Sequence, residues 1–465
     1  MLGKLFRRRG RNKVFVIGLD CAEPSLVFDR YADDLPNLSR LVAQGRHGPL
    51  ETTIPAITVP AWSSMFSGRD PGELGFYGFR NRADYSYDKM RIATGAAVAA
   101  PRVWDMAGDA GKRVAVVGVP QTYPVRPVNG LMISGFLTPN TRSTYTWPAE
   151  LKDEVQEVVG DYALDVQPFR TDRKEQLLGQ IQAMTAQHCA LVKHLLDKKP
   201  WDLFVWVEIG VDRIHHGFWK YGDPSHPMYE PGNPFERAMH DYYVHLDGQI
   251  GEMLALLPRD TTVVVLSDHG GQPMIGGFCI NEWLMQRGYL VLKEQPEGIA
   301  RLEDCVIDWE RTRAWASGGY YARVFVNVAG REPQGVVPSE EYEAFRNQLA
   351  AELEATTDQR NDPIGTRAFR PEDVYRRVTN IPPDLIVYLG NLAWRSVGSV
   401  GHGTLHVFEN DTGPDDANHA QNGLYIASGG EPQTKPAPRT WHAVAPTILE
   451  GLGLTAPGWM GEERL

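Results

Sequence analysis

The feature that most constrains the fold of this chain is a set of short, unbroken apolar runs. VFVIGL from Val14 and TTVVVLS from Thr261 are rich in β-branched residues and lack the alternation typical of a half-buried strand. Continuous apolar runs of this length indicate strands that are covered on both faces, as in parallel sheets. The runs begin at Val14, Arg113, Asp202, Thr261, Asp384 and Gly423. We therefore predict six strands that are buried on both faces.

Helical patterns alternate with these runs. LPNLSRLVAQG follows the first run and ends on Gly45, a residue type that commonly terminates helices. Residues 233–257 predict a long helix, and HAVAPTILEGLGL predicts the last one. Strands and helices in alternation predict an α/β fold, with an open, doubly wound, mostly parallel sheet and helices on both faces.

Two regions interrupt the alternation. Residues 70–200 are rich in Gly, Pro and Tyr before helical segments begin, and residues 275–400 combine a helix-turn, an antiparallel segment (YYARVFVNV) and a further helix. We expect both regions to be cap insertions in a single catalytic core over residues 14–465. Residues 1–13 form a basic tail, which we expect to be a solvated arm, with contact to anionic lipid as the alternative.

Composition excludes several classes of protein. The 465 residues include 47 Lys and Arg against 58 Asp and Glu, a formal charge of −11, which argues against a dedicated nucleic-acid binder. Four scattered cysteines without a CxxC pair exclude a disulfide framework and a thiolate cluster, and they favour a reducing, cytoplasmic compartment. No apolar stretch reaches the ~18 residues that a membrane span needs. The first apolar run stops at Asp20, too early for a signal peptide.

Polar residues at the ends of the predicted strands are the candidates for a functional site, since ligands bind doubly wound sheets at the carboxyl ends of strands. Asp20 follows the first run, Asp212 follows the third, and Asp268-His269 follows the fourth. A single aspartate at a strand end is also typical of a turn or helix cap. Three carboxylates and a histidine at the ends of three predicted strands together indicate a functional site.

The spacing within these motifs suits metal ions. Asp212 and His216 are four residues apart and share one face if the segment is helical. Asp268 and His269 are adjacent, so we expect their side chains to point apart and to suit two neighbouring metals. Carboxylate and imidazole without thiolate favour zinc, with manganese as the second choice. A helix cap beside a surface histidine is the alternative interpretation of each pair.

Thr58, in AITVPAWSSMFSG, is the candidate nucleophile. Pro60 is a favourable first helical residue, so Thr58 is expected just before a helix N-terminus, where unpaired amide groups bind phosphate. A hydroxyl there can attack phosphorus if a metal lowers its pKa. The alternative is a threonine that only caps the helix.

Together these motifs resemble the alkaline phosphatase superfamily. More narrowly, they resemble its type I phosphodiesterase/nucleotide pyrophosphatase branch, with predicted phosphohydrolase and phosphomutase relatives, over roughly Val14 to Leu454. The motifs that carry the resemblance are Asp20, Thr58-x-Pro60-Ala61-Trp62, Asp212-x-x-x-His216, Asp268-His269-Gly270 and His419-x-x-x-Gly423.

The resemblance implies a two-metal site for phosphoryl transfer. A phosphothreonine would form on Thr58, and water would then hydrolyse it and release phosphate or a phosphomonoester. One metal would be held by Asp212, His216 and His419. The other would be held by Asp20, Asp268 and His269, with Thr58 as a further ligand. His402 and His406 compete with His419 for the last position, and the match of His-x-x-x-Gly to the family pattern favours His419.

Departures from the family pattern leave the substrate open. No asparagine lies in Val59–Trp62, where nucleotide pyrophosphatases offer an amide to phosphate, and Pro71–Gly75 lacks the usual histidine. Sulfatases of this superfamily carry Cys or Ser in a Cys-x-Pro-x-Arg pattern. The corresponding segment here, Thr58–Trp62, has neither the Cys or Ser nor the Arg. We expect a hydrolase acting on a small-molecule phosphate ester, with a phosphodiester as the first choice. A phosphomonoesterase, a phosphomutase and a catalytically silent binding protein are the alternatives.

Two further groups could contact substrate. Arg213, His215 and Lys220 flank the Asp212 motif, and a solvated helix face explains them equally well. An aromatic and basic run could line a substrate entrance, although core packing is the commoner role of such residues. This run comprises Phe76, Tyr77, Phe79, Arg80 and Arg82.

Overall fold

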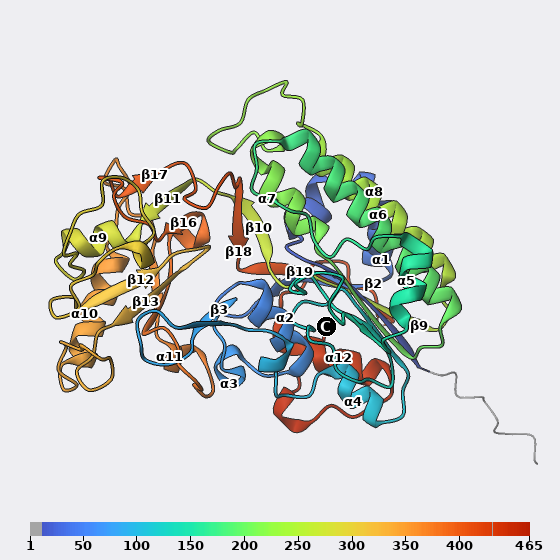
Figure 1. The fold of residues 1–465 in the computed structure, drawn as a ribbon. Helices are drawn as coiled ribbons and strands as arrows, with labels where there is room; N and C mark the ends of the chain where they lie inside the picture. The colour runs from blue at the N-terminus through green and yellow to red at the C-terminus, as the bar shows by residue number, and fades with distance from the viewer. Residues whose placement is uncertain (1–11, 430) are drawn as a thin grey trace, which may run out of the picture.

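The computed structural model describes residues 12–429 and 431–465, which form a large sheet between helices and a smaller unit beside it (Figure 1). The large sheet has nine strands in the order β20-β2-β19-β9-β1-β8-β5-β6-β7. All of them except β7 and β19 run in one direction. The bounds are β1 Lys13–Leu19, β2 Gly45–Glu51, β5 Val114–Val117, β6 Gly130–Ile133, β7 Thr146–Trp147, β8 Leu203–Glu208, β9 Thr261–Leu266, β19 Asn422–Ser428 and β20 Arg439–Thr440. The predicted α/β class with a mostly parallel sheet is confirmed.

Helices cover both faces of this sheet (Figure 1). Successive residues of β1 belong to two different cores, because side chains alternate across a strand. Phe15 and Ile17 pack with α1, α5, α6, α7 and α8, whereas Val14 and Val16 pack with α2, α4 and α12. The bounds are α1 Pro36–Gln44, α2 Thr58–Ser67, α4 Val103–Asp109, α5 Leu151–Val159, α6 Lys174–Lys198, α7 Gly210–Gly222, α8 Ala238–Leu256 and α12 Val444–Gly451.

The smaller unit has its own hydrophobic core. It contains a three-stranded sheet, β16-β11-β17, and a four-stranded antiparallel sheet, β12-β13-β15-β14. Its elements are β11 Gly276–Cys279, α9 Ile280–Gln286, β12 Ala314–Ser317, β13 Ala322–Val326, α10 Tyr342–Glu354, β14 Arg367–Phe369, α11 Pro371–Val374, β15 Leu385–Tyr388, β16 Trp394–Val397 and β17 His406–Val407. Two short pairs lie between the unit and the large sheet: β10 Gly270–Pro273 with β18 Ala417–Ala420, and the hairpin of β3 Arg80–Arg82 and β4 Met90–Ile92, preceded by α3 Pro71–Leu74.

Five of the six predicted strands belong to the large sheet, and the sixth, which begins at Asp384, belongs to another sheet. The run from Asp384 forms β15 in the four-stranded sheet of the smaller unit. The run from Gly423 forms β19, which is antiparallel to both of its neighbours. A continuous apolar run shows that both faces are covered, but it carries no information on which sheet the strand joins or in which direction it runs.

The two regions expected to be cap insertions lie differently. Residues 275–400 form most of the smaller unit, whereas residues 70–200 contribute β5, β6, β7 and three helices to the large sheet and its covering layers. The loops of that segment are rich in Gly and Pro, but helices and strands continue to alternate through it. Residues 1–11 of the predicted basic tail lie outside the described residues, and Lys13 begins β1. Among the described residues, none of the helices combines the length and the hydrophobicity that a membrane span requires.

Candidate active site

The carboxylates that follow three strands meet at one edge of the sheet. Because β1, β8 and β9 are adjacent and parallel, their carboxyl ends lie together. Asp20 comes directly after β1, Asp212 lies in the first turn of α7 after β8, and Asp268 lies just beyond β9. The amide of Asp20 donates to the carbonyl of Glu208 (3.1 Å), and the amide of Cys21 donates to Asp268 Oδ1 (3.2 Å). The turn after β1 is thus tied to both neighbouring strand ends.

His419 reaches the same edge from β18. Since β19 is antiparallel to β9, the amino end of β19, which follows His419, lies at the carboxyl ends of the parallel strands. The Nδ1 atom of His419 donates to the carbonyl of Ala56 (2.9 Å), so Nε2 faces the cluster. This Nε2 lies 3.9 Å from Asp212 Oδ1, and the ring stacks on His269 with centroids 3.8 Å apart.

The two competing histidines lie elsewhere. Nε2 of His402 is hydrogen-bonded to Ser399 Oγ (2.9 Å), and Nε2 of His406 donates to the carbonyl of Thr357 (2.8 Å). Both belong to the smaller unit. The structure therefore brings His419 to the carboxylates and leaves the other two histidines away from them.

Asp212 and His216 share one face of α7, as their spacing predicts. His216 Nε2 lies 3.3 Å from Asp212 Oδ1. On its other side, His216 donates from Nδ1 to Asp415 Oδ1 (2.6 Å), and Asp415 is fully buried. Asp415 is a partner of the site that the sequence motifs did not reveal. The available signal was a carboxylate four residues before His419, because metal-binding histidines are commonly oriented by an acidic partner.

Asp268 and His269 converge, whereas we expected them to point apart. His269 Nε2 lies 3.2 Å from Asp268 Oδ2 and 3.8 Å from Asp20 Oδ1. The chain bends at these two residues between β9 and β10, which cancels the alternation that a straight strand would impose. Both side chains therefore face the same group of atoms.

Thr58 begins α2, and its Oγ1 lies 3.3 Å from His269 Nε2. The helix starts two residues earlier than predicted, so its cap position belongs to Ile57, and Thr58 does not cap it. The first turn of a helix leaves amide groups without intrahelical partners and carries positive dipole, which favours a phosphate. The hydroxyl is thus placed between a helix N-terminus and the cluster of acids and histidines.

The cluster leaves several buried atoms without partners. Asp20 Oδ1, Asp268 Oδ2, His216 Nε2 and His419 Nε2 have no hydrogen-bond partner, although other atoms of these side chains are bonded. Ligand atoms of Asp20, Asp268 and His269 lie within 4.8 Å of one another, and so do those of Asp212, His269 and His419. Buried polar atoms are normally paired. Carboxylate and imidazole atoms left open in this way fit divalent cations.

The electrostatics of the cluster favour a cation as well. Burial and the charge of Asp212 raise the pKa of Asp20, and burial and the charge of Asp20 raise the pKa of Asp268. Burial lowers the pKa of His269 to about 4 and also lowers the pKa of His419. Both imidazoles are therefore neutral near pH 7, the state in which a ring nitrogen binds metal. Mutually repelling carboxylates beside neutral imidazoles are stabilised by a bound cation.

Cys21 lies at the edge of the cluster, with Sγ within 4.8 Å of ligand atoms of Asp212 and His216. Burial and the neighbouring carboxylates, first Asp212, raise the pKa of its thiol well above the usual value. A metal-binding cysteine is a thiolate. The Cys21 Sγ donates to the carbonyl of Gly270 (3.5 Å), a contact that suits the small, buried packing residue expected at this strand end.

A cleft of about 510 Å³ opens onto Thr58, Asp212 and His419 between the large sheet and the smaller unit. Of the residues that flank the Asp212 motif, Arg213 lines this cleft, whereas Lys220 pairs with Asp416 (3.4 Å). His215 is buried and accepts a hydrogen bond from the Tyr243 hydroxyl (3.0 Å).

The aromatic and basic run divides in the same way. Phe79 and Arg80 line the cleft. Phe76 and Tyr77 are buried in the core, and Arg82 is buried against Glu332 (2.9 Å).

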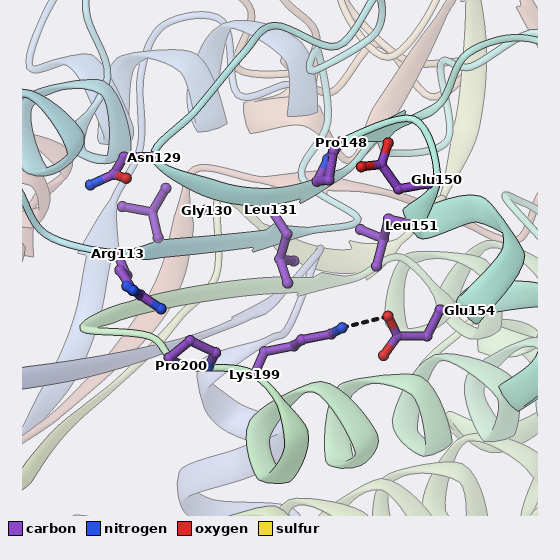
Figure 2. Close-up of a pocket in the computed structure, with 11 residues that line it drawn as sticks. Arg113, Asn129, Gly130, Leu131, Pro148, Glu150, Leu151, Glu154, Lys199 and Pro200 are labelled. Atoms are coloured by element: carbon purple, nitrogen blue, oxygen red, sulfur yellow. Dashed lines mark ion pairs between the residues drawn. The ribbon is translucent and has the colours of Figure 1, made fainter.

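A second cavity, of about 370 Å³, lies at the opposite edge of the large sheet (Figure 2). Its walls come from the starts of β5 and β6, the start of α5 and the segment between α6 and β8. Leu131 and Leu151 line it beside the ion pair of Lys199 with Glu154 (2.5 Å). None of the candidate metal ligands lines this cavity, whereas Asp212 and His419 line the cleft.

Comparisons with known proteins identify the family and the fold of the chain. Residues 14–415 match the family described as type I phosphodiesterase/nucleotide pyrophosphatase. No curated protein is significantly similar to the chain in sequence. Phosphonoacetate hydrolase from Sinorhizobium meliloti 1021 has a similar structure, with a TM-score of 0.60, 18% identity and 96% of each chain covered. Murine ectonucleotide pyrophosphatase/phosphodiesterase 5 is also similar, with a TM-score of 0.54, 13% identity and 96% of each chain covered. At these identities the structures share the fold.

Because the family match covers most of the chain, the protein belongs to the type I phosphodiesterase/nucleotide pyrophosphatase family of the alkaline phosphatase superfamily and is a phosphoric ester hydrolase.

Proposed function

We propose that the protein hydrolyses a small-molecule phosphodiester through a phosphothreonine formed on Thr58, with two divalent metal ions, zinc first and manganese second. Asp212, His216 and His419 would hold one ion. Asp20, Asp268 and His269 would hold the other, with Thr58 as a further ligand. When bound, two such ions supply positive charge for the reacting phosphoryl group and lower the pKa of a coordinated hydroxyl.

The residues of the chain supply the remaining requirements. Thr58 is buried, stands at the start of α2 and opens onto the cleft, so a phosphoryl group can approach its Oγ1 there. The amide groups of the first turn of α2 favour the negative charge of that phosphoryl group. His269 Nε2 lies 3.3 Å from Oγ1, so an ion held by His269 would also reach the Thr58 hydroxyl and would favour the loss of its proton.

One observation carries the proposal. Four buried atoms, on Asp20, Asp268, His216 and His419, have no hydrogen-bond partner, and they belong to the cluster that contacts the Thr58 hydroxyl through His269. These residues come from segments of the chain that are far apart in sequence. A catalytically silent binding protein would have no physical need for such a cluster, because unpaired buried polar atoms cost free energy.

The proposal is tested with bis-p-nitrophenyl phosphate and p-nitrophenyl phosphate, each with zinc and then with manganese. We expect faster turnover of the diester and a loss of at least about 10³-fold in the Thr58→Ala variant. Metal content should stay close to that of the unchanged protein, because six other side chains hold the ions. Full activity in Thr58→Ala would show that another group is the nucleophile.

The assay also separates the alternative activities. A phosphomonoesterase would turn over the monoester faster than the diester. A phosphomutase would return the phosphoryl group to a second hydroxyl, so added alcohols would yield new phosphate esters in place of free phosphate. A silent binding protein would turn over neither ester and would hold well under two ions per chain.

A further inference from the structure

The walls of the cleft carry more positive charge than their own carboxylates neutralise. Two carboxylates line the cleft. Asp165 is paired with Arg213 through bonds of 2.8 and 2.9 Å, and Asp212 belongs to the metal-ligand cluster. Against them stand five lining arginines, which are Arg80, Arg170, Arg213, Arg323 and Arg395.

Arg80 and Arg323 form ion pairs with no carboxylate of the described residues. Arg323 lies on β13 of the smaller unit, and its guanidinium donates to the backbone carbonyl of Arg80 on β3. Arg80 is exposed and Arg323 is half-buried. Figure 1 shows β3 between α2, which carries Thr58, and the smaller unit. Both residues thus line the cleft, and neither guanidinium group is paired with a carboxylate of the described chain.

Arg395 is a third lining arginine, and its guanidinium group is only partly paired. The residue is only 3% exposed, and its Nε has no hydrogen-bond partner. Its Nη1 lies 3.2 Å from Asp415 Oδ2, but the same oxygen accepts from Arg170 Nε over 2.8 Å, while the other oxygen of Asp415 holds His216. One carboxylate therefore serves two guanidinium groups and an imidazole.

The arginines lie close to the reaction centre but do not belong to it. The ring of Tyr320 stacks on His419 with centroids 3.9 Å apart, and the Arg395 guanidinium carbon lies 4.8 Å from the centroid of the Tyr320 ring. Arg170 donates to the Tyr320 hydroxyl over 2.9 Å. Arg395 is therefore one residue removed from the candidate ligands, through Tyr320 to His419 and through Asp415 to His216.

We propose that Arg80, Arg323 and Arg395 form a second anion-binding site in the cleft, so that the substrate carries a carboxylate or a further phosphate besides the phosphoryl group that Thr58 attacks. The inference rests on the proposed function and adds the substrate class. Guanidinium groups suit this task because they bind carboxylate and phosphate oxygens with two parallel hydrogen bonds. Substrates with a neutral leaving part would leave the arginines unpaired and would bind more weakly.

Binding of non-hydrolysed phosphonates tests the proposal without turnover. The probes are 3-phosphonopropionate and 4-phosphonobutyrate, each compared by calorimetry with its own primary amide, on metal-loaded protein. The amide keeps the size and removes only the charge. We expect the carboxylate of at least one pair to bind on the order of tenfold more tightly than its amide. Propane-1,3-diphosphonate, compared with propylphosphonate, shows whether a second phosphate group is preferred to a carboxylate.

Variants locate the preference. Arg80→Met removes an exposed cation, and Arg323→Gln removes a charge but keeps a donor for the Arg80 carbonyl. Each should reduce the ratio of the affinity for the carboxylate to the affinity for its amide several-fold, and Arg323→Lys should restore part of this ratio. The matched control is Arg91→Met, because Arg91 is exposed on β4 beside β3 but does not line the cleft. Arg91→Met should leave the ratio unchanged.

The outcomes separate this inference from the proposed function. Equal affinity of charged and neutral partners in all three pairs would overturn the anion site, even if the enzyme hydrolyses diesters. An unchanged ratio in both Arg80→Met and Arg323→Gln would also overturn it. The protein could instead prefer the charged probes, lose this preference in both variants, and hydrolyse no phosphate ester. That result would support the anion site and contradict the proposed function.

Discussion

His216 donates a hydrogen bond from Nδ1 to Asp415 Oδ1 over 2.6 Å, which leaves Nε2 facing Asp212. This contact sets the tautomer and the orientation of the ring. Burial disfavours the charged imidazole, but the charge of Asp415 outweighs it and raises the pKa of His216 in the metal-free protein. A metal must therefore displace a proton from Nε2, and the Asp415 carboxylate then makes the ring a stronger ligand.

Asp415→Asn keeps an acceptor oxygen but removes the charge. We expect metal affinity to fall about 10- to 100-fold. Titration with zinc under a competing chelator measures this change. The control is Asp411→Asn, because Asp411 is exposed and bonds to Ser399 rather than to a candidate ligand. Wild-type affinity in a folded Asp415→Asn variant would show that Asp415 does not tune the site.

The two histidine candidates for the last ligand can be separated by paired substitutions. His419→Ala should lose roughly one metal ion per chain, because His419 Nε2 is open and faces Asp212. His402→Ala should keep its full metal content, because His402 is hydrogen-bonded to Ser399 in the smaller unit. Elemental analysis after dialysis decides between them, and the reverse pattern would contradict the assignment.

Trp62 supports the cluster through a single hydrogen bond, from Nε1 to Asp20 Oδ2 (2.8 Å). Trp62→Phe keeps the stacking on Phe66 but removes this donor, so we expect a loss of about 1–3 kcal/mol beyond the effect of size. Trp104→Phe is a matched control, because Trp104 is equally buried in the same core and its Nε1 has no partner. Urea unfolding of the metal-free proteins measures the difference, and equal losses would contradict the role of the bond.

Glu23 makes stability depend on pH. Burial raises its pKa from 4.5 to about 7. Between these values the folded state holds a proton that the unfolded chain has released, so stability is lost as pH rises from about 4.5 through about 7. Glu23→Gln removes this loss. We expect the variant to gain stability relative to the unchanged protein between pH 5 and pH 8, by at most about 3 kcal/mol.

Urea unfolding at both pH values measures this gain. Glu310→Gln, at an exposed position, is the control and should show no such gain. The free energies of unfolding of Glu23→Gln and of the unchanged protein could instead differ by the same amount at pH 5 and pH 8. This would mean that Glu23 does not titrate in this range.

The sequence was sufficient to predict the parallel core and the candidate ligands, because both depend on local patterns. Buried runs predict strands, and a polar residue after each run predicts a position at the carboxyl edge. The direction of β19 could not be predicted, although it is what places His419 at that edge. Strand direction and pairing depend on contacts between distant segments.

The smaller unit and the support around the site show the same limit. The run that forms β15 is as apolar as the core runs, but it pairs with β13 and β14 outside the large sheet. The bond from His216 to Asp415 joins residues that are 199 positions apart, and the contact of Arg323 with Arg80 spans 243 positions. Spacing rules act within one element, so they could not identify these partners.

Metal stoichiometry tests the central claim most directly. We would load the metal-free protein with zinc, remove the excess by gel filtration and count ions per chain by elemental mass spectrometry. Two buried sets of open carboxylate and imidazole atoms predict two ions per chain, falling to about one in Asp20→Ala and in Asp212→Ala. Fewer than one ion in the folded, unchanged protein, with zinc and with manganese, would contradict the two-metal site.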